Sequence, residues 1–240
     1  MLVVVGSQHD QAAQELVAAW TTHCAALLTC EDLSTAGWQL RVPGRSRSQA
    51  VVSGKIISEE DIQGVVMRRP WIIEGELTHI TASDREYVAA EMNAFLLAWL
   101  TSLKCPVLNR PSGTSLCGPN WRAFQWAQAA AAAGFKVQPA KWRVPPPRTN
   151  CSKHSEEPSP LIDVTVIGKR CIGEVELQCQ EAARRLSQRA NTILLGVRLR
   201  RTDDGPVFAS ATATPDLKGE EIANAVVNYM LANRAKSGSA

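Results

Sequence analysis

Residues 196–221 read GVRLRRTDDGPVFASATATPDLKGEE, and they contain the most informative pattern in this chain of 240 residues. Residues 193–201, ILLGVRLRR, are rich in apolar residues and predict a strand. The Asp204-Gly205 pair is typical of a tight hairpin turn, and residues 207–213 predict a second strand. A loop containing a proline then leads into a helix. The segment is therefore expected to form a β-hairpin followed by a closing helix.

This segment resembles the C-terminal end of the ATP-grasp fold, in the branch of glutamate ligases and peptide maturases. The family pattern is roughly G-V-D-L-x-x-x-x-x-G-P-x-x-x-E-V-N-x-x-P-x-L-x-G. The frame, the Gly-Pro pair and the Pro-x-Leu-x-Gly ending are all present here. Three family positions differ, because Asp, Glu and Asn are replaced by Arg198, Ser210 and Thr212. The resemblance implies that these are lost metal-ligand positions.

The three replacements have a direct chemical consequence. ATP-grasp ligases activate a carboxylate as an acyl phosphate, and Mg²⁺ on the ATP phosphates is held by carboxylate and amide oxygens. A guanidinium about 4 Å from a dication would be repelled by roughly 8 kcal/mol at an effective dielectric constant near 20. We therefore assign no catalytic residue, no metal site, and no tightly bound ATP or Mg²⁺. Four acidic residues remain that could rebuild a metal site from another direction: Asp203, Asp204, Asp216 and Glu220.

The resemblance extends over most of the chain but has a gap. GVVMRRP (64–70) and the strand ending in VLNRP (107–111) resemble the N-terminal domain that precedes the ATP-grasp domain in peptide maturases. VTVIGKRCIGEVE (164–176) resembles the family hairpin R-V-x-V-V-G-D, with Asp163 at the position of the arginine. In full-length relatives a nucleotide-grasping subdomain precedes this hairpin. Only a short proline-rich connection occupies its place here, which implies a truncated, degenerate ATP-grasp fold.

The patterning predicts an α/β protein of two lobes. Residues 1–143 alternate strands with helices, which favours a parallel sheet with flanking helices. Residues 144–160, VPPPRTNCSKHSEEPSP, form a proline-rich linker. Residues 161–234 are expected to form a smaller antiparallel α+β lobe, and residues 235–240 a tail.

Two helices carry the clearest signals in the sequence. Residues 84–103 follow a capping-box pattern that starts at Ser83, and residues 121–133 are preceded by Asn120 and end at Gly134. We expect the capping box to open the first helix and Asn120 to cap the second.

Composition excludes several classes of protein. A hydrophobic fraction of 45% with 20% charged residues is an ordinary globular balance, and no apolar run approaches the length of a membrane span. A net charge of +3 is too small to indicate nucleic-acid binding. The seven cysteines are odd in number and lack a C-x-x-C pair, so we expect reduced thiols in a cytoplasmic protein with no metal.

Four arginines are candidates for binding an anion. Arg68, Arg69 and Arg110 follow strands of the expected parallel sheet, where open α/β folds place ligand crevices. Arg122 lies near the position of the family's nucleotide-binding lysine. Each guanidinium could bind a carboxylate or phosphate in bidentate fashion, or could equally form a structural ion pair.

Three functional hypotheses follow. The first is a catalytically degenerate ATP-grasp-like protein that acts by binding a protein partner or by self-association, as a scaffold, a substrate-presenting protein or a regulator. The alternative is an ATP-dependent carboxylate–amine ligase in peptide modification or cofactor biosynthesis. The third is an unrelated enzyme with Cys117 as nucleophile and His79 or His154 as base, against the simpler interpretation of Cys117 as a loop thiol without a role.

Overall fold

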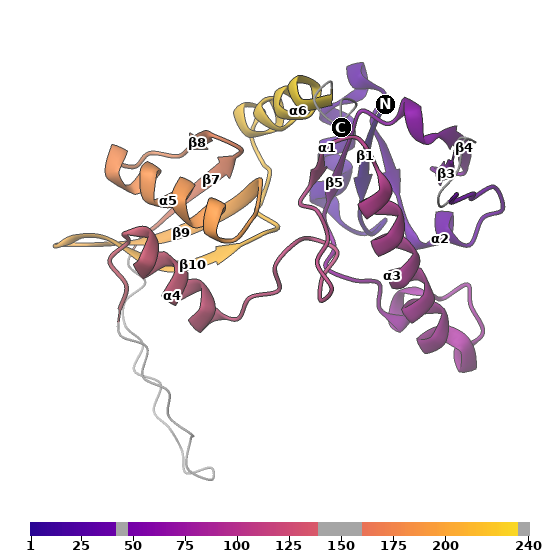
Figure 1. Cartoon of the computed structure of the whole chain (residues 1–240), viewed down its shortest axis with the longest axis horizontal. Coiled ribbons are helices and arrows are strands. Elements are labelled where there is room, and N and C mark those ends of the chain that lie inside the picture. The colour runs from indigo at the N-terminus through magenta and orange to yellow at the C-terminus, as the bar shows by residue number, and fades with distance from the viewer. Residues whose placement is uncertain (42–47, 139–159, 235–240) are drawn as a thin grey trace, which may run out of the picture.

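The computed structural model describes residues 1–41, 48–138 and 160–234, which form two lobes joined in part by the C-terminal helix (Figure 1). The predicted tail and all but the last residue of the predicted linker lie outside the described residues. The mixed α/β architecture, with one parallel sheet and a separate antiparallel sheet, confirms the predicted fold class.

The N-terminal lobe is built on a four-stranded parallel sheet in the order β2-β1-β5-β6. Its strands are β1 (Leu2–Val5), β2 (Ala26–Leu28), β5 (Gly64–Met67) and β6 (Val107–Leu108). Both faces of the two central strands are buried. This explains why their sequences are continuous apolar runs and do not alternate with polar residues.

Helices α1 (Gln11–Ala19) and α3 (Arg85–Ser102) cover opposite faces of this sheet, because successive strand residues point to opposite sides. Leu2 and Val4 share a core with α1, whereas Val3 and Val5 share a core with α3. The remaining elements of the lobe are short: α2 (Cys30–Leu33), β3 (Gln49–Val52), β4 (Lys55–Ser58) and 3-10 turns at Thr21–His23, Glu59–Asp61, Glu74–Glu76 and Ala82–Asp84.

The predicted cap of α3 was wrong. The helix begins at Arg85, after a 3-10 turn, and its N-cap residue Asp84 makes no side-chain capping bond. The hydroxyl of Ser83 donates to the Asp84 carboxylate at 2.9 Å instead of accepting from the helix backbone. The 3-10 turn places Ser83 outside the geometry that a capping box requires.

The C-terminal lobe contains an antiparallel sheet in the order β10-β9-β7-β8. Its strands are β7 (Leu161–Ile167), β8 (Arg170–Ile172), β9 (Leu194–Thr202) and β10 (Gly205–Thr212). One face is covered by helix α5 (Leu177–Arg189), and the opposite face carries polar side chains beside the buried Ile167 and Leu194.

Helix α4 (Ala123–Ala133) also packs on the C-terminal sheet, although it precedes the predicted lobe boundary in sequence. Its buried residues Trp126 and Ala130 share a core with Val197 and Leu199 of β9. The helix begins at Ala123 with Arg122 as N-cap residue, so the expected cap at Asn120 was wrong. Periodicity identifies such a helix but does not specify which sheet it covers.

Helix α6 (Glu220–Arg234) connects the two lobes, since its apolar face shares a core with both. Val226 and Met230 lie in the same cluster as Leu2 of β1 and Ile167 of β7. At Gly64 an added Cβ would lie 2.5 Å from the sulfur of Met230, so only glycine leaves room for the helix on this strand.

Asn109 forms the most complete polar connection between the lobes. The side chain is 1% exposed, and its amide nitrogen donates to the carbonyls of Leu194 at 2.8 Å and Ala213 at 2.9 Å. Its carbonyl oxygen accepts from the backbone N–H groups of Ile193 and Leu194, both at 2.8 Å. The two donors and two acceptor sites of the side-chain amide are thus all in use.

We predict that Asn109→Ala lowers the free energy of unfolding by about 2–4 kcal/mol, because it leaves buried backbone N–H and C=O groups without partners. Urea denaturation followed by circular dichroism would measure the change. The matched control is Asn228→Ala at an exposed position of α6, which should change stability by less than about 0.5 kcal/mol. Equal effects of the two substitutions would contradict the role given to Asn109.

Candidate functional site

The polar face of the C-terminal sheet carries a cavity of about 470 Å³, called here the sheet-face cavity. Strands β7, β9 and β10 and the loop before α6 line it. The three replaced family positions, Arg198, Ser210 and Thr212, all contribute to its wall, so the structure brings them together. The other charged or hydroxyl-bearing lining residues are Asp163, Thr165, Asp216 and Lys218.

Arg198 and Asp163 form an ion pair in this cavity. They lie directly opposite each other in the β7–β9 register, and the Arg198 Nε atom is 2.8 Å from a carboxylate oxygen of Asp163. Both side chains are more than half exposed, so the pair contributes at most about 1 kcal/mol to stability. Its effect on the site is larger, because the guanidinium and the carboxylate neutralise each other within the cavity.

The four acidic residues considered for a rebuilt metal site do not lie together. Asp216 lines the sheet-face cavity and pairs with Lys218 at 3.3 Å. Asp203 and Asp204 lie in the β9–β10 turn, at the other end of the hairpin from Thr212. In the described ranges, no group of three or more His, Cys, Asp and Glu residues could hold a metal ion.

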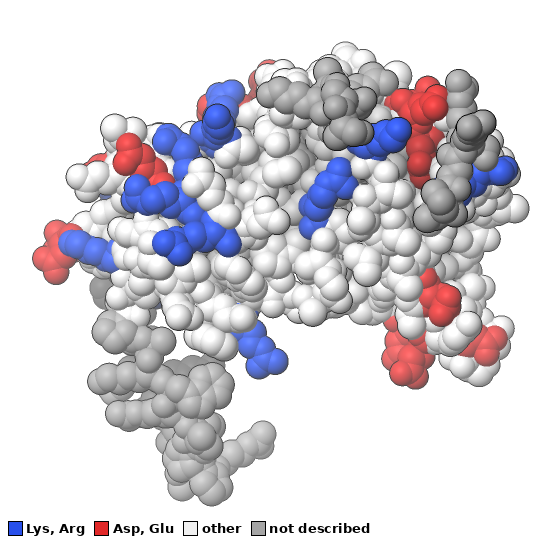
Figure 2. Space-filling view, in the orientation of Figure 1, with Lys and Arg blue, Asp and Glu red and all other residues white. Residues whose placement is uncertain are grey.

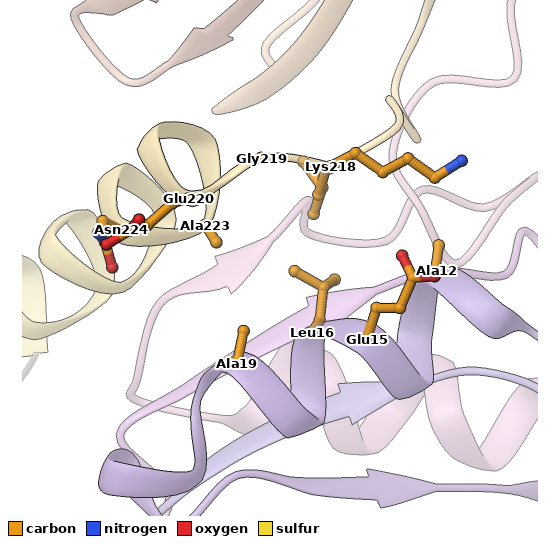
Figure 3. A pocket seen from close by; sticks show the side chains of 10 residues that line it. Ala12, Glu15, Leu16, Ala19, Lys218, Gly219, Glu220, Ala223 and Asn224 are labelled. Atoms are coloured by element: carbon orange, nitrogen blue, oxygen red, sulfur yellow. The ribbon is translucent and has the colours of Figure 1, made fainter.

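Glu220 lines a different cavity, of about 560 Å³, between α1 and the start of α6. Figure 3 shows Glu15 and Leu16 extending from α1 toward the segment that carries Gly219 and Glu220. Glu15 also lines this cavity, and its carboxylate accepts a hydrogen bond from Gln11. Two carboxylates therefore lie on opposite walls, outside the sheet-face cavity.

Two of the candidate anion-binding arginines, Arg68 and Arg69, form ion pairs within the chain. Arg68 pairs with Asp10 at 3.2 Å and donates to the carbonyl of Pro215 at 2.8 Å. Arg69 is 6% exposed and pairs with Glu76 at 2.6 Å. These contacts match the second interpretation of the sequence, in which the arginines form structural ion pairs.

Arg110 and Arg122 occupy helix ends in different lobes. Arg110 donates to the carbonyls of Leu100 and Leu103 at the end of α3, where backbone acceptors lack helical partners. Arg122 is exposed at the start of α4. The four arginines therefore do not form a common anion site in the described structure.

The environment of Cys117 contradicts its role as a nucleophile. The side chain is 4% exposed, and burial raises the pKa of the Cys117 thiol to about 12. Helix α4 begins only at Ala123, so Cys117 does not lie at its N-terminus. His79 lies 2.9 Å from the Ser34 hydroxyl, whereas His154 lies outside the described residues. The sequence could not reveal that this loop is buried.

We predict that Cys117 resists iodoacetamide in the native protein at pH 8, because a thiol with a raised pKa stays protonated until the pH approaches 12. Exposed Cys24 is the internal control and should be alkylated under the same conditions. Both should react in urea. Peptide mass spectrometry reads out each site, and alkylation of native Cys117 at pH 8 to the same extent as Cys24 would contradict this prediction.

Lys218 is a cavity residue that the sequence interpretation did not single out. It lies inside the Pro-x-Leu-x-Gly motif, between the motif residues Leu217 and Gly219, and its ammonium group pairs with Asp216. The motif places it beside the replaced positions, which is the signal that could have identified it.

In the part of the chain that the structure describes, no helix is long and apolar enough to cross a membrane.

Solved structures with the same fold are ATP-grasp ligases. The macrocyclase MdnC from Microcystis aeruginosa MRC, bound with precursor peptide MdnA, matches with a TM-score of 0.72 and 10% identity, covering 96% of this chain and 99% of that chain. A Chryseobacterium gregarium RiPP-associated ATP-grasp ligase, in complex with ADP and a leader and core peptide, matches with a TM-score of 0.63 and 12% identity over 100% and 97% of the two chains.

A third match is the ATP-grasp ligase PsnB complexed with minimal precursor, Mg and ADP, with a TM-score of 0.66 and 14% identity over 95% of this chain and 98% of that chain. No protein-family model and no curated protein sequence matches this chain. At these identities the comparisons establish the fold alone, and the fold is ATP-grasp-like.

Proposed function

We propose that this protein binds a peptide or protein partner on an ATP-grasp-like scaffold and does not catalyse ATP-dependent ligation. The observation that carries the proposal is the Arg198–Asp163 ion pair in the sheet-face cavity. Relative to the family pattern that the sequence resembles, the charges of the pair are reversed. The arginine takes the place of a metal-binding aspartate, and the aspartate takes the place of an arginine.

Electrostatics explains why the reversed charges disfavour the binding of Mg²⁺-ATP. Mg²⁺ requires anionic oxygen ligands in near-octahedral geometry, whereas Ser210 and Thr212 offer neutral hydroxyls and Arg198 offers a positive charge. Asp163 also places a negative charge where the resemblance implies an arginine. Both charges in the cavity therefore differ in sign from those of the family pattern.

The length of the chain before β7 supports the proposal further. Gln138 and Leu161 are separated by residues 139–160, which is 22 residues. A connection of this length has no room for the nucleotide-grasping subdomain that the resemblance implies for full-length relatives. On this proposal, the chain lacks both the metal ligands and the second wall of a nucleotide site.

A peptide partner is suggested by the structural neighbours. Several of the ligases that share this fold were solved with precursor, leader or core peptides. We propose that peptide binding is the part of the scaffold's function that persists here. A cytoplasmic location remains a prediction from the cysteine content.

ATP-dependent carboxylate–amine ligation is the second candidate function. It is favoured by the fold itself, because the structural neighbours are ligases, two of them solved with ADP. Asp163 and Asp216 also leave two carboxylates in the sheet-face cavity. This candidate requires the Arg198–Asp163 pair to open and the carboxylates to bind the metal in a new arrangement.

Isothermal titration calorimetry with Mg²⁺ and ATP separates the two candidates. We expect no binding heat with protein on the order of tens of micromolar, because the two carboxylates of the cavity are each paired with a cation. Heat with a micromolar dissociation constant would overturn the proposal and support the ligase.

A variant with the family pattern provides the matched control for the titration. Asp163→Arg, Arg198→Asp, Ser210→Glu and Thr212→Asn together restore the charges that the resemblance implies, and all four positions are exposed. We expect this variant to bind Mg²⁺ at millimolar concentration, detected with Mn²⁺ by paramagnetic relaxation. If it binds no metal, the replaced residues are not what prevents metal binding.

A further inference from the structure

Two cysteines of the C-terminal lobe lie on adjoining elements. Cys171 is the middle residue of β8, and Cys179 lies in the first turn of α5. Helix α5 contacts strand β8, and the two elements lie beside each other in Figure 1. The six described cysteines are all free thiols, and the other four belong to the N-terminal lobe: Cys24, Cys30, Cys105 and Cys117. The structure therefore brings two thiols of one lobe to a single interface.

Both thiols face the same core. Cys171 lies directly opposite Val166 in the β7–β8 register, and opposite residues of an antiparallel pair point to the same face. Val166 is buried in the core under α5, and both cysteines pack against that core. On α5, Cys179 begins the apolar stripe that continues with the buried residues Ala182 and Leu186. The strand thus presents one thiol to the β8–α5 interface and the helix presents the other.

The connection between the two cysteines is short and is held by its own contacts. Only residues 172–178 separate them. Gly173 has a φ of +143°, and an added Cβ would lie 2.8 Å from the carbonyl oxygen of Asp163, so the chain turns tightly against β7. The N–H of Val175 donates to the carbonyl of Gly173 at 3.0 Å, and the Val175 carbonyl accepts from the Gln180 side chain at 3.2 Å. The fold, and not a long flexible loop, holds the thiols near each other.

Electrostatics distinguishes the two thiols. Burial raises the pKa of the Cys171 thiol, the Arg184 guanidinium lowers it, and the neighbouring Cys179 thiol raises it. Burial also raises the pKa of the Cys179 thiol, and Glu176 raises it further. Figure 2 shows Lys and Arg side chains gathered on the C-terminal lobe. Because a cation stabilises a thiolate, Cys171 is the better placed of the two to react first.

The start of α5 leaves room for the small movement that a bond between the sulfurs requires. A disulfide needs Cα atoms about 4.4–6.8 Å apart. Cys179 lies in the first turn of α5, whose N–H groups have no acceptors within the helix. The N-cap residue Glu176 makes no side-chain capping bond, so this turn is held less firmly than the rest of the helix.

We propose that Cys171 and Cys179 form a dithiol that a peroxide converts into an internal disulfide. Cys171 loses its proton and attacks one peroxide oxygen, the O–O bond breaks, and with hydrogen peroxide the other oxygen takes up a proton and leaves as water. Cys179 then loses its proton, attacks the resulting sulfenic sulfur and displaces hydroxide, which leaves as a second water. Two electrons pass from the sulfurs to the peroxide, and a thiol reductant reverses the change.

The disulfide would also affect a neighbouring surface. Ile172 and Gly173, which follow Cys171, line the sheet-face cavity. A covalent bond between β8 and α5 therefore fixes the strand that forms one wall of that cavity. The modification site itself does not depend on what the cavity binds.

Peptide mapping of the full chain tests the proposal. The native protein is treated with hydrogen peroxide, its remaining thiols are blocked with iodoacetamide in urea, and it is digested with trypsin without reductant. Trypsin releases residues 171–184 as one peptide that contains both cysteines. We expect this peptide to lose about 2 Da relative to its free dithiol form and to carry no alkylated thiol, because the disulfide removes two hydrogen atoms.

Three variants separate the two thiols from the rest of the chain. Cys179→Ser should leave a sulfenic acid on Cys171 that dimedone traps, whereas Cys171→Ser should leave mostly unoxidised thiol at Cys179. Cys24→Ser, at an exposed cysteine in the other lobe, is the matched control and should form the same internal disulfide. A peptide 171–184 that keeps both thiols free while Cys24 is oxidised would overturn the proposal.

Equilibration with glutathione redox buffers tests whether the fold brings the thiols together. We expect the equilibrium constant for forming the disulfide to be at least about tenfold greater in the native protein than in urea, because the fold raises the effective concentration of one thiol at the other. Circular dichroism confirms that each variant is folded. Equal constants in the two states would overturn the proposal, because the ring would then close through chain proximity alone.

Discussion

The arrangement of the two lobes depends on the hydrogen bonds of the Asn109 side chain. The side chain ends the parallel sheet of one lobe and satisfies backbone groups at the start of β9 and after β10 in the other. Arg68 reinforces the same junction through the carbonyl of Pro215. These contacts fix the loop that leads into α6, whose apolar face then joins the two cores. The walls of the sheet-face cavity are positioned by this junction.

The C-terminal lobe has two kinds of surface, one polar and one mostly apolar. In the sheet-face cavity, Arg198 pairs with Asp163 across two strands and Lys218 pairs with Asp216 within one loop, so the charges largely offset each other. A second surface, between α4 and β10, is mostly apolar and includes Phe124, Val137 and Phe208. Both surfaces share strand β10, because residues 207–209 line the apolar surface and residues 210–212 line the sheet-face cavity.

Local patterns in the sequence predicted individual elements well. The two strand-like runs on either side of the Asp-Gly turn predict a hairpin, and the structure has it at Leu194–Thr202 and Gly205–Thr212. The periodic apolar stripe of α3 likewise gave the helix to within a residue at each end. Its cap was missed, because a 3-10 turn before the helix depends on neighbouring contacts and not on the four-residue pattern.

The sequence by itself determined the order of the elements and the α/β class, because these follow from short-range patterns and from side-chain chemistry. The tertiary structure alone decided that α4 covers the C-terminal sheet, that Cys117 is buried, and that Arg68 and Arg110 are occupied by carbonyl groups. Each of these depends on contacts between residues far apart in the chain. Burial and partners are properties of the packed chain, and no local spacing encodes them.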